Sequence, residues 1–150
     1  MNVQEKLRVA KQLVKLGVDN IEAGFPIASE GDFEAVRRIA NEVRGATIAG
    51  LARAKEPDIK RAYEAVKDAP NKRIHTFHST SDIHLKYQFR VSREEALKRS
   101  VEMVRLARSL VDDVEFSPMD ATRTELPYLL DVVEAVVEAG ALTVNIPDTV

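Results

Sequence analysis

The chain contains no cysteine, and this absence excludes several kinds of chemistry. Without a thiol there is no disulfide, no thiolate nucleophile and no metal site with cysteine ligands. The lack of cysteine also agrees with a reducing compartment, so we expect a cytoplasmic protein. No apolar run approaches the roughly 20 residues that a membrane-spanning helix needs, and we expect no membrane partner.

An excess of positive charge is also absent. The formal net charge is −2 and the isoelectric point is about 6.0, whereas proteins that bind nucleic acids usually present a basic surface. We therefore expect no nucleic-acid partner. Hydrophobic residues make up 45% and charged residues 31% of the 150 residues, which is the balance of a globular protein. We predict one domain, residues 1–150, with no internal linker.

Helix and strand patterns alternate along the whole chain. Helices begin at Asn2, where Glu5 completes a capping box, and at Ser92, where Glu95 does the same. The patterns predict helices over 2–17, 29–45, 57–70, 92–107 and 126–140, a short helix within 79–91, and strands over 18–23, 46–51, 73–77, 112–116 and 142–146. The strands start about 26 to 40 residues apart, which is the repeat length of a parallel α/β sheet.

The faces of the strands distinguish a barrel from an open sheet. A sheet with helices on both faces is apolar on both faces, but four of these strands alternate in polarity. In each strand the apolar residues point to one side and the polar residues to the other. The apolar residues are Ile21 and Ala23, Ile74, Val114 and Phe116, and Leu142, Val144 and Ile146. The polar residues of the same four strands are Asn20 and Glu22, Arg73 and His75, Glu115 and Ser117, and Thr143 and Asn145. We therefore predict an α/β fold of the (β/α)8 TIM-barrel type, with polar residues facing the barrel mouth.

Three histidines follow or lie in the third predicted strand. His75 faces inward, where it is a candidate to hydrogen-bond a substrate carbonyl. His78 lies on the opposite side of the strand or in the loop, so the spacing argues against a shared histidine metal site. We expect surface or loop roles for His78 and His84.

Other charged residues at strand ends have both a catalytic and a structural interpretation. Arg53 is able to hold a carboxylate with two hydrogen bonds, but a salt bridge at a helix edge is favoured. Asp120 and Arg123 are expected to form a charge pair at a helix start.

Four stretches together resemble a known enzyme family. They read GVDNIEAGFPIASEGDFEAV (17–36), RIHTFHSTSDIHLKY (73–87), ARSLVDDVEFSPMDATRTE (107–125) and GALTVNIPDTV (140–150). Their order and spacing resemble the 2-isopropylmalate and homocitrate synthase family, which consists of metal-dependent TIM-barrel enzymes. The chain is similar to the pyruvate-carboxyltransferase-like catalytic domain of that family over essentially all its length.

The resemblance implies a Claisen-type condensation of acetyl-CoA with 2-oxoisovalerate, giving 2-isopropylmalate and CoA in the first committed step of leucine biosynthesis. It also implies a divalent metal, Mg²⁺ or Mn²⁺, that binds the keto acid, and a homodimer for the full-length protein. Five residues match positions of the family's substrate pocket: Glu22, His75, Ser117, Asn145 and Thr149.

The chain departs from the family pattern in two ways. Met119 stands where the family commonly has glutamate, and a thioether can neither carry a negative charge nor act as a base. The family's Arg-Asp-Gly-Glu motif and its His-x-His metal ligands do not occur in these 150 residues. We therefore expect about strands two to six of an eight-stranded barrel, with the metal ligands and the family's catalytic arginine outside this chain. Because both edge strands would be unpaired, the isolated chain is expected to self-associate and to be inactive.

Alternative functions remain open from the sequence. Homocitrate and citramalate synthases belong to the same family and differ in a few pocket residues, including those near Leu51 and His75. A phosphate-binding barrel aldolase or epimerase is an enzyme of another class, and a half-barrel scaffold or binding module is a non-enzymatic alternative. The segment from His75 to Tyr87 favours 2-isopropylmalate synthesis.

Overall fold

The computed structural model describes all of residues 1–150 as alternating strands and helices around one parallel sheet. In chain order the elements are α1 (Val3–Leu16), β1 (Asn20–Gly24), α2 (Glu30–Glu42), β2 (Thr47–Arg53), α3 (Glu56–Val66), β3 (Lys72–Ser79), α4 (Asp82–His84), the π-helical turn η1 (Leu85–Phe89), α5 (Arg93–Leu110), β4 (Asp113–Met119), the 3₁₀ turn η2 (Ala121–Arg123), α6 (Leu126–Glu138) and β5 (Thr143–Val144). The strand order is β1-β2-β3-β4-β5 and every pair is parallel. The predicted α/β alternation is confirmed.

Local capping defines where the helices begin and end. Asn2 accepts a hydrogen bond from the Glu5 amide, and the Glu5 carboxylate accepts one from the Asn2 amide, so the predicted capping box of α1 is confirmed. The same reciprocal pair joins Ser92 and Glu95 at the start of α5. Gly17 ends α1 with φ of 89°, a left-handed conformation that glycine adopts without a steric penalty.

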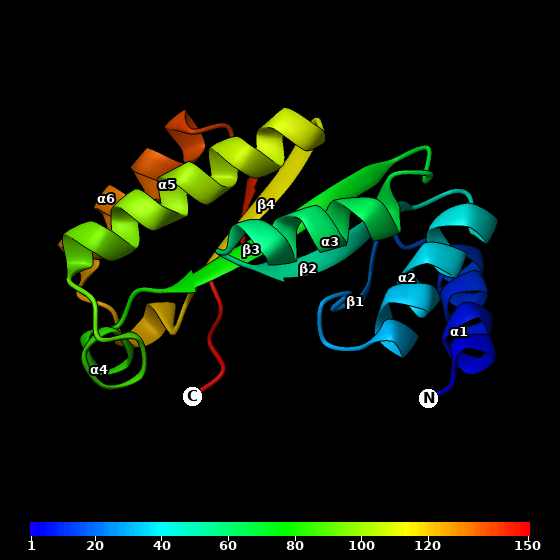
Figure 1. The fold of residues 1–150 in the computed structure, drawn as a ribbon, viewed down its shortest axis with the longest axis horizontal. Helices are drawn as coiled ribbons and strands as arrows, with labels where there is room; N and C mark the ends of the chain where they lie inside the picture. Colours follow the sequence, from blue (N-terminus) through cyan, green and yellow to red (C-terminus); the bar gives the residue numbers. More distant parts are fainter.

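Two apolar clusters lie between the sheet and its helices. The first packs α3, α5 and α6 on β3 and β4 around the fully buried Phe116, and the second packs α1 and α2 on β1 and β2 around Val36 and Ile48. Figure 1 shows the long helix α5 lying along the strands, with α6 beside it. The apolar residues predicted for β1, β3 and β4 all point into these clusters, which leaves the polar residues of those strands on the opposite face.

The prediction for the fifth strand is only partly right. A strand was expected over 142–146, but only Thr143 and Val144 pair with β4. Val144 packs against the first apolar cluster, whereas Leu142 is 66% exposed and Ile146 is 50% exposed. The expected apolar face is therefore wrong for these two residues, because no helix of the chain covers them.

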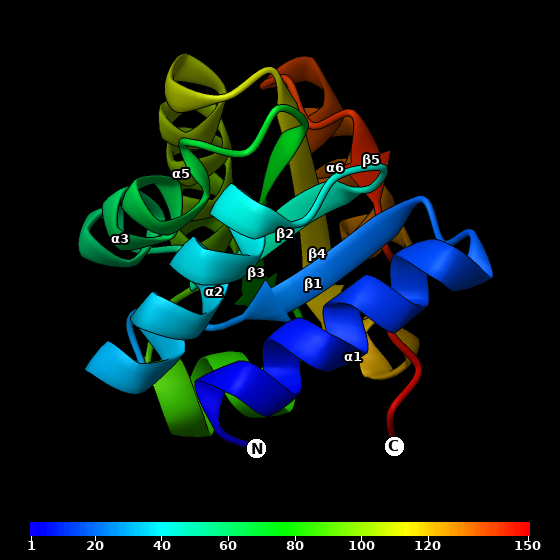
Figure 2. The ribbon, with the colours of Figure 1, turned by 90° about the vertical axis from the view of Figure 1, so that its right-hand side faces the viewer.

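The segments that follow the carboxyl ends of the parallel strands lie together at one end of the sheet. Both chain termini lie at this end (Figures 1 and 2). The expected short helix after β3 is confirmed as α4 and η1. The end of β3 is tied to the end of β4, because the Thr80 amide donates to the Met119 carbonyl at 3.1 Å.

Candidate functional site

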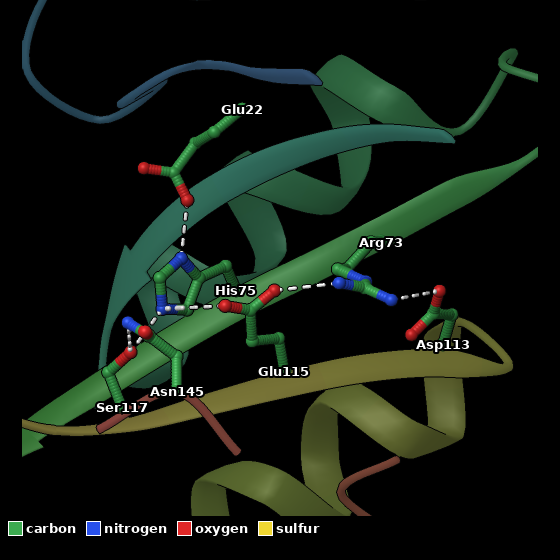
Figure 3. A network of polar contacts seen from close by, with 7 residues as sticks. All are labelled: Glu22, Arg73, His75, Asp113, Glu115, Ser117 and Asn145. Atoms are coloured by element: carbon green, nitrogen blue, oxygen red, sulfur yellow. Dashed lines mark hydrogen bonds and ion pairs between the residues drawn. The ribbon is translucent and has the colours of Figure 1, made fainter. Parts of the chain in front are cut away.

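A network of polar side chains occupies the sheet face that the helices leave open (Figure 3). At its centre is His75 of β3, which is 9% exposed. Its Nδ1 contacts the carboxylate of Glu22 on β1, and its Nε2 lies 2.7 Å from the hydroxyl of Ser117 on β4. The parallel register brings these residues together, because β3 pairs with β4 from Arg73–Asp113 to Ser79–Met119. Three of the five predicted substrate residues thus form one contiguous unit.

Asn145 joins this unit from the segment that follows β5. Its side-chain Nδ2 donates a hydrogen bond to the Ser117 hydroxyl at 2.9 Å. The backbone amide of Asn145 donates to the Phe116 carbonyl, which fixes the segment beside β4. Thr149 is different: it is exposed, and no hydrogen bond links it to the other four residues. Its contact with substrate stays a prediction.

Sequence reasoning did not single out three further members of the network. Arg73 on β3 donates to Glu115 at 2.8 Å and to Asp113 at 3.0 Å, and Glu115 lies 3.8 Å from His75 Nε2. The Arg73 side chain is 13% exposed, so its charge is balanced by two carboxylates at a largely buried position. The alternation of the strands indicates that Arg73 and Glu115 lie on the same face as His75 and Ser117, so this pattern could have identified them.

A second polar cluster connects the segments that follow β3 and β4. Asp120 has φ of 64°, is 4% exposed, and accepts a hydrogen bond from Arg123 Nε at 2.7 Å. The expected charge pair is therefore confirmed, but it also extends to His84, whose Nδ1 lies 3.6 Å from Asp120 and 2.8 Å from the Ser79 hydroxyl. The hydrogen bond from Arg123 lowers the pKa of Asp120 below its ordinary value of 3.8.

The expected surface or loop role of His78 is wrong. His78 lies within β3 and is 4% exposed, and its ring contacts Phe89 of η1 in a tilted arrangement with 5.0 Å between ring centroids. Burial lowers the pKa of its imidazole below 6.5, because removal from water disfavours the charged form. His78 lies on the same side of β3 as Ile74, which is the side covered by helices. The sequence places His78 on that side, but only the tertiary structure shows that Phe89 packs against it.

The remaining candidates have structural positions. Arg53 forms the predicted salt bridge, with its Nε 2.6 Å from the carboxylate of the buried Asp58 at the start of α3. Met119 is partly buried at the end of β4, and its carbonyl accepts hydrogen bonds from the Ser79 hydroxyl and the Thr80 amide at the end of β3. Neither residue adds an acid or a base to the network around His75.

The residues present do not fit a metal ion. No group of three or more His, Cys, Asp or Glu side chains in the chain is arranged to hold one. Glu22 and Glu115 approach different nitrogens of the same imidazole rather than a common point. No helix of the chain has both the length and the apolar character needed to cross a membrane.

The fold and the site define a class: an α/β barrel domain, incomplete here, with a polar site on the inner face of its parallel strands. Comparison with known proteins supports this class. A model of the HMGL-like family matches residues 1–150, so the chain belongs to the HMGL-like family. A crystal structure of the Bacillus subtilis HMG-CoA lyase superposes on 99% of this chain and 52% of that chain with a TM-score of 0.80 at 18% identity, which shows the shared TIM-barrel fold. The predicted fold class is confirmed.

Curated relatives are similar over the entire chain. The chain is 68% identical to a 2-isopropylmalate synthase of Syntrophus aciditrophicus, 61% identical to one of Rhodopirellula baltica and 59% identical to one of Pyrococcus furiosus, each over 150 residues. The chain spans only 28% to 30% of the length of these three proteins. The predicted family resemblance is confirmed.

Proposed function

We propose that this chain forms the keto-acid side of the active site of a 2-isopropylmalate synthase. In this proposal the complete enzyme condenses acetyl-CoA with 2-oxoisovalerate, giving 2-isopropylmalate and CoA in leucine biosynthesis. The observation that supports it most directly is His75, which is held between Glu22 and Ser117 on the open face of the sheet. The relatives at 57% to 68% identity that carry this name support the choice of reaction.

The polar groups fit the binding of a small keto acid. The Ser117 hydroxyl and the Asn145 amide lie together, and the second N–H of Asn145 Nδ2 offers a neutral donor to a carboxylate or carbonyl oxygen. His75 has one nitrogen on a carboxylate, which fixes the orientation of its ring. Phe77 and Leu51 stand beside this group on the same face, since Leu51 pairs with His75 and Phe77 pairs with Ser117. These apolar side chains suit the branched hydrocarbon end of 2-oxoisovalerate.

A divalent metal, Mg²⁺ or Mn²⁺, belongs to the proposal as the family's cofactor. Because the side chains of this chain do not form a metal site, its ligands are proposed to lie in parts of the enzyme outside these 150 residues. A homodimer and a cytoplasmic location are proposed on the same basis, from the resemblance and from the absence of cysteine.

A chimera tests the proposed reaction. The homologous segment of the Syntrophus aciditrophicus relative, which is 68% identical over all 150 residues, is replaced by this chain. With Mg²⁺ or Mn²⁺ the chimera is expected to release CoA from acetyl-CoA with 2-oxoisovalerate and to form 2-isopropylmalate, as measured by thiol detection and mass spectrometry. The variant His75→Ala within the chimera is expected to lose about 100-fold or more in kcat/KM.

The same chimera separates the alternatives. Faster turnover with pyruvate or 2-oxoglutarate would replace the proposal by citramalate or homocitrate synthesis. A folded chimera that turns over none of the three keto acids would contradict the proposed function and favour the half-barrel module.

A further inference from the structure

The contacts around His75 favour one direction of hydrogen bonding. An ionised carboxylate only accepts hydrogen bonds, so the contact with Glu22 favours the imidazole tautomer that carries its proton on Nδ1 of His75. The Nε2 atom then presents its lone pair to the Ser117 hydroxyl at 2.7 Å. Asn145 Nδ2 only donates, so the Ser117 oxygen accepts that bond, and with the imidazole proton on Nδ1 the Ser117 hydroxyl donates to Nε2 of His75.

This direction gives the three residues the roles of an activated serine. A hydroxyl becomes a nucleophile when an imidazole within hydrogen-bond reach takes its proton and a carboxylate orients that imidazole. We propose that Glu22, His75 and Ser117 form an acyl-transfer triad, in which Ser117 accepts acyl groups from thioesters or activated esters of small carboxylic acids. The inference goes beyond the proposed condensation and stands on the geometry of these side chains alone.

The proposed step is balanced within the site. The Ser117 oxygen attacks the acyl carbonyl carbon while its proton passes to Nε2 of His75. The carbon–sulfur or carbon–oxygen bond of the donor breaks, and the leaving thiolate or alkoxide takes the proton from His75. Water then attacks the Ser117 ester with His75 again as the base, which releases the carboxylic acid and restores the serine.

Two neighbouring groups support these roles. Glu115, held by Arg73, lies 3.8 Å from Nε2, so a carboxylate faces the positive charge that the imidazole gains during the step. Asn145 donates a hydrogen bond to the Ser117 oxygen, which fixes the position of the hydroxyl beside His75. Ser117 is 5% exposed, so little water competes for these hydrogen bonds.

Covalent labelling tests the triad directly. The chimera described above is treated with a fluorophosphonate serine probe and with p-nitrophenyl acetate, and the modified residue is identified by peptide mass spectrometry. Modification is expected at Ser117, and its rate is expected to fall about 100-fold in His75→Gln and to fall clearly in Glu22→Gln. Ser117→Cys keeps a nucleophile at the position and is expected to accept the acetyl group from p-nitrophenyl acetate. Ser109→Ala is the matched control, since Ser109 is exposed on α5 and bonds only the Leu106 carbonyl.

Specific outcomes would overturn the triad. Ser117 left unmodified in a chimera whose circular dichroism matches that of the Syntrophus aciditrophicus relative, under conditions that fully label an established serine hydrolase, would do so. Labelling of Ser117 at an unchanged rate in both His75→Gln and Glu22→Gln would also exclude activation. No keto acid or metal enters these assays, so their result is independent of whether the chimera performs the condensation.

Discussion

At the scale of single residues, Asp120 shows how one side chain links two parts of the site. Its carboxylate is 3% exposed, binds Arg123 and faces His84, and so connects the segments that follow β4 and β3. Asp and Asn both tolerate the left-handed backbone that Asp120 adopts, with φ of 64°. Asp120→Asn therefore removes the charge with little change in backbone strain.

We predict that Asp120→Asn is destabilised relative to the wild type at neutral pH and that this difference shrinks in acid. The folded pKa of Asp120 is lowered, so the ionised carboxylate stabilises the fold above its unfolded pKa of about 3.8. That contribution is lost as the pH falls through the lower folded pKa. Urea unfolding at a series of pH values from 7 to below 3.8 measures the difference. A difference that stays constant over this range would show that the charge of Asp120 is not its cause.

At the scale of elements, helix ends depend on backbone conformation that only some residues can adopt. Gly17 ends α1 with φ of 89°, and a Cβ there would meet no atom within 4 Å. Gly31 lies in the first turn of α2 with no positive φ, and its nearest atom would be the Ser29 hydroxyl at 3.7 Å. Both positions have room for a methyl group, so they differ mainly in backbone strain.

The same substitution is therefore expected to have opposite effects at the two glycines. Gly17→Ala should lower the free energy of unfolding by about 1 kcal/mol, because alanine is strained in the left-handed region. Gly31→Ala should raise it by about 0.4–1 kcal/mol, because alanine restricts the unfolded chain and favours the helix. Urea denaturation of both variants at one pH measures the pair. Equal destabilisation by the two variants would contradict the prediction, because it would mean that the added methyl group, and not backbone strain, lowers the free energy of unfolding.

At the scale of the whole molecule, the sheet ends in two open edges. β1 pairs only with β2, and β5 pairs only with β4. The segment around β5 also exposes Leu142 and Ile146. An edge with free backbone groups and apolar side chains is a template for pairing with a second chain.

We therefore predict that the isolated 150-residue chain self-associates and that the double variant Leu142→Lys with Ile146→Lys reduces this association. Charge at a sheet edge opposes edge-to-edge pairing. Sedimentation velocity over a range of concentrations measures the shift towards monomer. Tyr87→Lys is a control, because Tyr87 is 69% exposed in η1, which is not part of the sheet. A wild-type chain that stays monomeric at high concentration would contradict the prediction.

Much of the fold was predictable because its signals are local. The capping boxes at Asn2 and Ser92, the left-handed Gly17 and the alternation in β1, β3 and β4 each depend on a few neighbouring residues. The alternation also placed His75 and Ser117 on one face, and that is how part of the site was found. A structural feature that depends only on neighbouring residues can be predicted from the types of those residues and their spacing.

The sequence by itself thus determined the α/β alternation, the polar face and the family to which the chain belongs. Only the tertiary structure decided that β5 is two residues long, that His78 is buried against Phe89, and that Arg73, Asp113 and Glu115 complete the network. The physical reason is distance along the chain. Glu22 and His75 are 53 residues apart, and His75 and Ser117 are 42 apart. Their contact depends on the register of parallel strands, which side-chain packing across the whole sheet sets and no single segment encodes.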